Sequence, residues 1–317
     1  MAEQPAVVAN TDQRWFDYLS ATAVDGRLDE VNFWRPLAQS GFRALDPGQP
    51  FFFRLKHPVD AIAGYGYFTH ATRIPIRLAW DAFGQYNGDP TFEAFLNRIA
   101  EYRHETPMET LLGDRELTCL VLREVRFLSQ DQWLTWAREE EWSPNVVAYK
   151  GYDLAADPGR QLVGLVQNGE PAELSPDYVL QLDDQRMMAS QEVALRQGQG
   201  AFRVRLLDAY GRRCAVTGER TLPVLDAAHI TPYLGPISNH IQNGLVLRTD
   251  IHRLYDGGYV TVTPDLNFKV STRLKDEFEN GAVYYDLDGR PLEVIPEDRT
   301  KRPSREALEW HASNIFR

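Results

Sequence analysis

Cysteine is scarce in this sequence, since Cys119 and Cys214 are the two present in 317 residues and they lie far apart. So few cysteines exclude both a disulfide framework and a four-cysteine zinc site. We therefore expect two reduced thiols and no structural zinc. No run approaches the roughly 18 apolar residues of a membrane-spanning helix, and the first five residues lack the basic start of a secretory signal. These absences predict a cytoplasmic protein that does not contact a membrane.

Basic residues are also few compared with acidic ones, and the formal net charge is −11. Such a charge argues against a nonspecific nucleic-acid binder. The deficit is uneven: residues 1–195 hold 17 basic and 29 acidic residues, whereas residues 196–317 hold 17 and 16. The C-terminal part is therefore able to approach phosphates, while the N-terminal part needs a local positive groove to do so.

The composition that remains is that of a globular protein with room for two domains. In the first part, residues 1–150, a helix is expected from Asp12 to about Thr22 with Thr11 as its N-cap. The patterns that follow indicate strands at 51–55, 61–68 and 117–127, and two short helices between 75 and 103. We expect a domain of mixed α and β structure here.

Turn-forming dipeptides concentrate in residues 151–190, which we interpret as a connecting region with one short strand at 162–166. A second domain is expected at 191–317. Its most informative stretch, residues 225–258, predicts a strand, an irregular loop, a second strand at 244–248 and a short helix from Asp250. This ββα order brings His229, Asn243 and His252 toward one pocket.

Such a pocket has the groups that phosphodiester hydrolysis needs. A neutral imidazole accepts a proton from water near neutral pH. A second imidazole with a carboxylate is able to hold one divalent cation, which stabilises charge on a phosphate and its leaving oxygen. An Asn at the start of a strand fixes the loop and orients the base.

The spacing of His229, Asn243 and His252 resembles the HNH, or ββα-metal, endonuclease family. The wording of residues 196–218 and 226–256 resembles its bacterial restriction-endonuclease branch. The resemblance implies that His229 is the general base, Asn243 the orienting residue and His252 a metal ligand. It also implies one divalent cation, Mg²⁺ or another such as Mn²⁺ or Ni²⁺, and double-stranded DNA as the partner.

Two positions depart from the family pattern. Ala228 stands where an acidic or histidine ligand often precedes the base, so Asp226 becomes the candidate second ligand by position. Cys214 has no partner for a structural zinc. Two alternatives stay open for Asp226, a ligand role and no role at the site. The second arises because a straight strand puts residues 226 and 229 on opposite faces. Asp250 is read as a helix N-terminal charge, and Asp256 is evenly balanced between a solvated helix end and a role near the metal.

Aromatic residues in the N-terminal part resemble those of predicted restriction endonucleases and, more loosely, of the PUA-like superfamily with its EVE, SRA and YTH members. That resemblance implies a modified-base pocket. A flipped base needs stacking faces and edge-reading amides, for which Asn32, Trp34 and Tyr65 are the candidates. The alternative for the neighbouring aromatics Phe33, Tyr67 and Trp80 is the core of a small barrel.

We therefore expect an α+β protein with an N-terminal PUA-like β-barrel with helices and a C-terminal ββα-metal nuclease domain. The function expected is modification-dependent DNA restriction, and by analogy with two-strand cleavage a homodimer. Two alternatives stay open. In the first, the chain is a nuclease whose N-terminal part senses a small signal or unmodified sequence. In the second, the chain binds DNA without cutting it.

Overall fold

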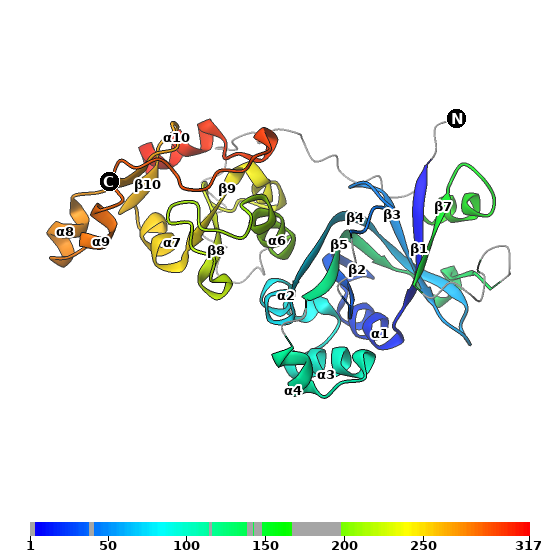
Figure 1. Cartoon of the computed structure of the whole chain (residues 1–317). Helices are drawn as coiled ribbons and strands as arrows, with labels where there is room; N and C mark the ends of the chain where they lie inside the picture. The colour runs from blue at the N-terminus through cyan, green and yellow to red at the C-terminus, as the bar shows by residue number, and fades with distance from the viewer. Residues whose placement is uncertain (1–3, 38–40, 114–115, 138–141, 143–147, 167–197) are drawn as a thin grey trace. The chain divides into compact units, whose positions relative to one another are not determined.

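The computed structural model describes residues 4–37, 41–113, 116–137, 142, 148–166 and 198–317, and the chain divides into two compact units, 1–173 and 174–317. Both units combine helices with strands, which confirms the α+β class (Figure 1). Among the described helices, none combines the length and the apolar character needed to cross a membrane.

A mixed sheet forms the centre of the N-terminal unit, with strand order β2-β5-β4-β3-β1-β7 and β6 paired to β4. Strands β1 and β3 run parallel, whereas the other pairs are antiparallel. The described strands leave this sheet open, without the closed barrel that the resemblance led us to expect. The strands are β1 (Pro5–Thr11), β2 (Arg27–Arg35), β3 (Pro50–Leu55), β4 (Ala61–Pro75), β5 (Glu116–Phe127), β6 (Leu134–Thr135) and β7 (Tyr149–Asp153).

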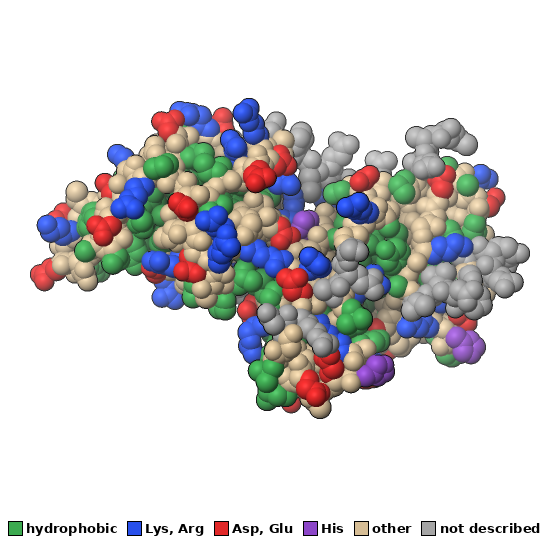
Figure 2. All heavy atoms as spheres, viewed as in Figure 1, with side chains coloured by type: hydrophobic (Ala, Val, Ile, Leu, Met, Phe, Trp, Pro, Cys, Tyr) green, Lys and Arg blue, Asp and Glu red, His purple; other side chains and the backbone are tan. Residues whose placement is uncertain are grey.

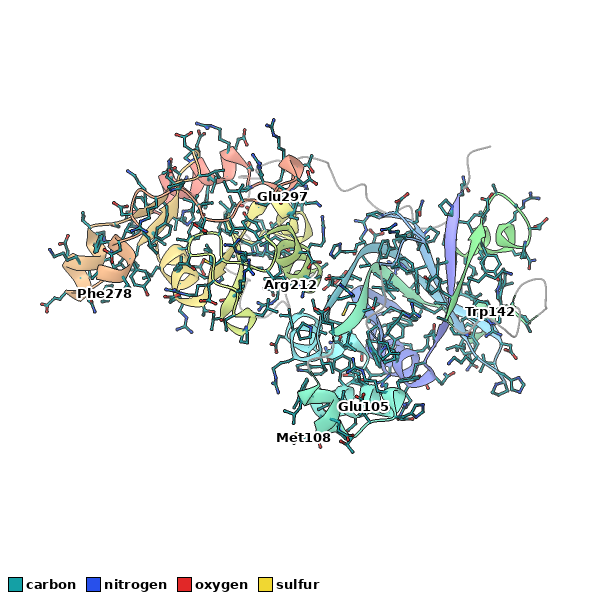
Figure 3. The ribbon with its side chains drawn as sticks, viewed as in Figure 1. Glu105, Met108, Trp142, Arg212, Phe278 and Glu297 are labelled. Atoms are coloured by element: carbon teal, nitrogen blue, oxygen red, sulfur yellow. The ribbon has the colours of Figure 1, made fainter. Side chains whose placement is uncertain are left out.

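Both faces of this sheet are covered. In β3, Phe51 and Phe53 point into one apolar cluster and Phe52 into the other, because side chains alternate along a strand. The second cluster is closed by Trp142, on whose ring the Arg54 guanidinium lies 4.7 Å from the centroid (Figure 3). The helices of the unit are α1 (Gln13–Thr22), α2 (Ile76–Phe83), α3 (Phe92–Arg103), α4 (Pro107–Leu112) and α5 (Val163–Val166), with short 3-10 turns at Gly84–Asn87, Gln130–Gln132 and Gly159–Leu162.

Two local expectations change. The N-cap of α1 is Asp12, whose carboxylate accepts from the Trp15 backbone, so the assignment of Thr11 was wrong by one residue. The strand expected at 162–166 is the end of a 3-10 turn followed by α5, because a short apolar run fits a strand and a buried helix equally well. Strand β7, at the start of the expected connecting region, pairs with β1.

The C-terminal unit is built on two short antiparallel pairs, β8 with β9 and β10 with β11. The sequence from 185 to 209 has a helical pattern, of which the later part forms α6 from Gln199, while residues 185–197 lie outside the described residues. The elements are α6 (Gln199–Ala209), β8 (Leu225–His229), β9 (Gly244–Arg248), α7 (Thr249–Asp256), β10 (Val260–Val262), β11 (Phe268–Val270), α8 (Arg273–Phe278), α9 (Ala282–Tyr285) and α10 (Arg305–Asn314), with 3-10 turns at Leu222–Val224, Pro236–Asn239, Ile241–Asn243 and Arg299–Lys301.

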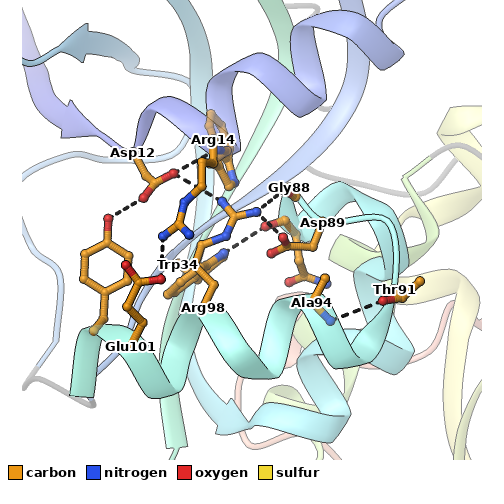
Figure 4. A network of polar contacts seen from close by, with 12 residues as sticks. Asp12, Arg14, Trp34, Gly88, Asp89, Thr91, Ala94, Arg98 and Glu101 are labelled. Atoms are coloured by element: carbon orange, nitrogen blue, oxygen red, sulfur yellow. Dashed lines mark hydrogen bonds and ion pairs between the residues drawn. The ribbon is translucent and has the colours of Figure 1, made fainter. Parts of the chain in front are cut away.

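A buried arginine ties α3 to the start of α1 (Figure 4). Arg98 is 5% exposed and pairs with both Asp89 and Asp12. Burial raises the pKa of Asp89 although Arg98 acts against this. At Asp12 burial also raises the pKa, but hydrogen bonds from Tyr102 and the Trp15 backbone, with Arg98, outweigh it and leave the pKa lowered. The arginine thus compensates two carboxylates that water reaches poorly.

We expect Arg98→Met to lower the free energy of unfolding of the N-terminal unit by about 3–5 kcal/mol, because it leaves Asp89 buried without its partner. Arg14→Met is the matched control, since Arg14 pairs with Glu101 at 2.9 Å while both side chains are more than half exposed. Its effect should be about 0–1 kcal/mol. Urea unfolding followed by tryptophan fluorescence measures both, and equal losses in the two variants would contradict the role of Arg98.

Candidate functional site

The ββα unit of the C-terminal part places three sequence-predicted residues around one loop. Strands β8 and β9 pair antiparallel with His229 opposite Gly244, and α7 follows β9 directly. A β-carbon at Gly244 would lie 2.7 Å from the ring of Phe202, so only glycine allows α6 to pack this closely on the strand pair. His229 therefore ends one strand beside a helix that is held tightly against it.

The imidazole of His229 has contacts on its plane and at its edge. Its ring stacks on Phe202 with centroids 4.2 Å apart and planes 10° from parallel. Its Nε2 lies 3.0 Å from Oδ1 of Asn239. The side chain is part-buried, so it keeps access to solvent while its orientation is restricted.

Asn243 is fully buried and joins the two ends of the loop between β8 and β9. Its Oδ1 accepts from the backbone N–H and the hydroxyl of Thr231, both at 2.9 Å, and its Nδ2 donates to the Ser238 carbonyl at 3.0 Å. With a longer bond from Nδ2 to the Thr231 carbonyl at 3.4 Å, these bonds saturate the amide within the loop. Asn243 thus fixes the loop, and the amide in hydrogen-bond contact with His229 is that of Asn239.

Asp226 and His252 lie side by side across β8 and α7. Nδ1 of His252 is 3.4 Å from Oδ2 of Asp226, and Nε2 of His252 is 3.4 Å from Oδ2 of Asp256. The hydrogen bond with His252, helped by those of Thr249 and the charge of Arg203, outweighs burial and holds the pKa of Asp226 below its usual range. A carboxylate with a lowered pKa therefore lies next to an imidazole nitrogen.

This donor pair fits a divalent cation. Two atoms that each lie about 2.1 Å from one ion are at most about 4.2 Å apart, and the Asp226–His252 contact is inside that limit. Within the described residues, no group of three or more His, Cys, Asp and Glu side chains is arranged to hold an ion. An ion held by this pair would need water or substrate oxygens to complete its shell.

A cavity of about 260 Å³ opens at this place and is lined by His229, His252, Asp256, Thr231 and Tyr233, among others. It is partly open to solvent, as a site for a polymer must be. On the face that Figure 2 shows, Lys and Arg side chains of the C-terminal unit are mixed with Asp and Glu. Binding of a phosphate chain there depends on local contacts more than on a field of one sign.

The N-terminal unit places Asn32 and Trp34 together through Asn87. Asn32 is fully buried and donates to Oδ1 of Asn87 at 2.9 Å, while the Trp34 indole N–H donates to the Asn87 carbonyl at 2.8 Å. Asn87 in turn donates to the carbonyls of Ala79 and Gly84. Oδ1 of Asn32 has no partner among the described residues. Asn32 thus supports Trp34 from inside the unit.

Trp34 forms part of the wall of a second cavity, of about 250 Å³. Polar groups of Asn10, Asp12, Arg35 and Lys56 also reach it. Neither Asn32 nor Tyr65 is among its lining residues, since Tyr65 packs on Phe52 and Tyr67 in the other apolar cluster. The aromatic residues of the wall are Trp15, Phe33, Trp34, Phe51, Tyr102 and Tyr149.

Comparison with known proteins decides the class of the C-terminal site, because residues 214–263 match the family model described as HNH endonuclease. These residues form an HNH endonuclease domain. The match confirms the nuclease predicted from the sequence, and HNH domains generally use a divalent metal ion. No curated protein matches the chain.

Several solved structures match this chain with low sequence identity and low TM-scores. ASCH from Zymomonas mobilis is 17% identical with a TM-score of 0.31 and covers 50% of this chain and 94% of its own, and a variant of it scores 0.33 at 15% identity, covering 52% and 99%. The modification-dependent TagI restriction endonuclease is 13% identical with a TM-score of 0.28 and covers 90% of this chain and 75% of its own.

Three residues around the HNH site lie in stretches that resemble the restriction-endonuclease branch, but no pattern in the sequence singled them out. Asn239 stands in an irregular loop, and Phe202 and Arg203 precede the motif by more than 20 residues. Arg203 donates to the Leu225 carbonyl at 2.9 Å and lies 3.5 Å from Asp226. A pattern search finds residues at fixed spacing, whereas these reach the site through tertiary packing.

We expect His252→Ala to raise the concentration of divalent cation needed for half-maximal cleavage by about 10–100-fold, because it removes one of the two candidate protein ligands. EDTA should stop cleavage and added Mg²⁺ or Mn²⁺ should restore it. His240→Ala is the control, since His240 bonds the Gln242 backbone within the loop. If Asp226→Asn follows the wild-type metal titration, the ligand role of Asp226 is wrong.

Proposed function

We propose that the protein is a modification-dependent DNA restriction endonuclease that hydrolyses phosphodiester bonds in its HNH domain. The observation that carries the nuclease part is one cavity lined by both His229 and His252, with Asp226 in contact with His252. A base and a cation site must lie together for an attacking water and a scissile phosphate to meet. The dependence on modification rests on the cavity of the N-terminal unit.

His229 is the general base of this proposal. It is restrained by Phe202 and Asn239 but remains part-exposed in the cavity, so a water beside it has access to the ring. A neutral imidazole has a nitrogen lone pair that is able to accept the proton of that water. Asn243 acts indirectly, because its hydrogen bonds fix the loop that carries His229 and Asn239.

Asp226 and His252 would hold one divalent cation, and the donor set suits Mg²⁺, Mn²⁺ or Ni²⁺. When bound, the cation neutralises charge on the scissile phosphate and stabilises the leaving oxygen. Asp256 contacts the other nitrogen of His252 and orients the ring. Because one cation serves one strand, cutting both strands of a duplex calls for two copies of the chain, which supports a homodimer on DNA.

In the N-terminal unit the aromatic wall suits a nucleobase. A flipped base loses its stacking in the duplex, and contact with aromatic rings offsets this by about 1–3 kcal/mol per base. Trp34 presents such a ring, and Arg35 and Lys56 bring positive charge to an otherwise acidic part of the chain. Asn32 serves as the buried support of Trp34, whereas the burial of Tyr65 in the other cluster argues against its contact with the base.

We expect His229→Ala to slow cleavage by on the order of 10²–10⁴, because the base acts in the transition state. The affinity for DNA should stay within a few-fold of wild type. Single-turnover cleavage and fluorescence anisotropy with the same labelled duplex measure the two quantities. Retained cleavage would remove His229 from the mechanism, and a wild-type chain that binds but never cuts would favour the non-catalytic alternative.

We expect cleavage to depend on DNA modification and Trp34→Ala to weaken cutting of modified DNA at least tenfold. The panel consists of duplexes of one sequence with unmodified bases, methylated or hydroxymethylated cytosine, or methylated adenine. Trp133→Ala is a matched control, because its indole also donates to a backbone carbonyl, that of Leu128, but does not line the cavity. Equal cutting of every duplex would reject this proposal in favour of a sensor of a small signal or of unmodified sequence.

A further inference from the structure

We infer that Asn239 is a positioning residue of the nuclease reaction, which selects the nitrogen of His229 that receives the proton. The inference rests on the proposed role of His229 as general base. Beyond that role, one nitrogen of His229 accepts the proton, and the Asn239 side chain selects which nitrogen it is.

The hydrogen bond between the two residues carries this inference. Nε2 of His229 lies 3.0 Å from Oδ1 of Asn239. An amide oxygen only accepts, so Nε2 must carry the hydrogen. A neutral imidazole has one N–H, and Nδ1 therefore keeps the lone pair that takes a proton from water. The contact with Asn239 holds the ring in this tautomer.

Two contacts together leave the ring one orientation. The stack on Phe202 fixes its plane, with a 10° angle between the rings. The bond to Asn239 then fixes the rotation of the ring within that plane, since only one edge faces the amide. Stacking alone would allow the ring to turn over and present either nitrogen to the cavity. Asn239 is thus what distinguishes the two nitrogens.

The position of Asn239 is itself determined by the loop. Its neighbour Ser238 is buried and is held twice, through its carbonyl by Asn243 at 3.0 Å and through its hydroxyl by the Leu234 backbone at 2.8 Å. Close packing of Gly198 adds to this, because a β-carbon there would lie 3.0 Å from Nδ2 of Asn239. The amide is therefore held in place before substrate binds.

Other ionisable groups face His229 from the elements around it. Tyr233 of the loop makes an edge contact with its ring, and His252 and Asp256 of α7 and His311 of α10 line the same cavity. On α6, Arg203 is engaged by Asp226 and the Leu225 carbonyl. All these groups are unchanged in variants of Asn239, so a change in pH dependence in such a variant reports on the Asn239 contact.

The test uses the full chain, saturating Mg²⁺ and the most rapidly cut duplex of the panel described above. We expect Asn239→Leu, which removes the acceptor, to lower kcat by about 10–100-fold with KM little changed. Asn239→Asp keeps an acceptor at the same place and adds negative charge, which raises the pKa of His229. Because the protonated ring is inactive as a base, the acid limb of the pH–rate profile should move to higher pH by about one unit.

A spectroscopic measurement reads the tautomer without cleavage. In ¹⁵N-histidine protein, the resonances of His229, identified by their loss in His229→Ala, should show an N–H at Nε2 and a lone pair at Nδ1. Asn239→Leu should give a mixture of the two tautomers. Ile237→Ala, on the same turn and exposed, is the control and should match wild type in spectrum and rate.

The outcomes separate this inference from the proposed function. If His229→Ala cuts like wild type, the proposed base is wrong and the inference fails with it. If His229→Ala is inactive but Asn239→Leu is as fast as wild type, or Asn239→Asp leaves the acid limb in place, the inference alone is overturned. Should Asn239→Leu fail to fold, the acid limb of Asn239→Asp and the wild-type tautomer decide the question.

Discussion

The arrangement of the nuclease site depends on one buried amide. Asn243 makes three close hydrogen bonds, two to Thr231 and one to Ser238, and so closes the loop that joins the two strands of the ββα unit. Leaving a buried amide unpaired costs about 1–3 kcal/mol per group, so the loop does not open readily. Thr231 lies two residues after His229 and Ser238 one before Asn239. The clamp therefore fixes both partners of the His229–Asn239 contact.

In the N-terminal unit, a second buried amide holds its neighbours in the same way. Asn87 is buried and accepts from both Asn32 and Trp34, and it anchors itself on two carbonyls of the α2 region. Arg98 holds the start of α1 through Asp12. Polar groups inside a protein are stable only when paired, and their pairing has strict geometry. The aromatic wall thus receives its shape from a polar network behind it.

The two parts of the chain differ in net charge. The acidic residues are concentrated before residue 196, whereas the part that carries the HNH domain is close to neutral. Within that domain the negative charge that matters is local, because Asp226 stays ionised between His252 and Arg203. A cation site needs such a carboxylate, while an approaching phosphate chain needs the rest of the surface not to repel it. The uneven charge of the sequence satisfies both conditions for the proposed function.

The sequence by itself determined the HNH domain and most of its elements, since the β9 strand was predicted at its observed bounds and the order of strand, loop, strand and helix is local. It also gave the spacing of His229, Asn243 and His252. Only the tertiary structure decided that Asn239 contacts His229, that Trp34 but not Tyr65 lines the cavity, and that the described sheet stays open. The first of these features depends on the hydrogen bond between Asn243 and Ser238, and the others on strand pairing and side-chain packing. They depend on partners distant in sequence, which no local pattern encodes.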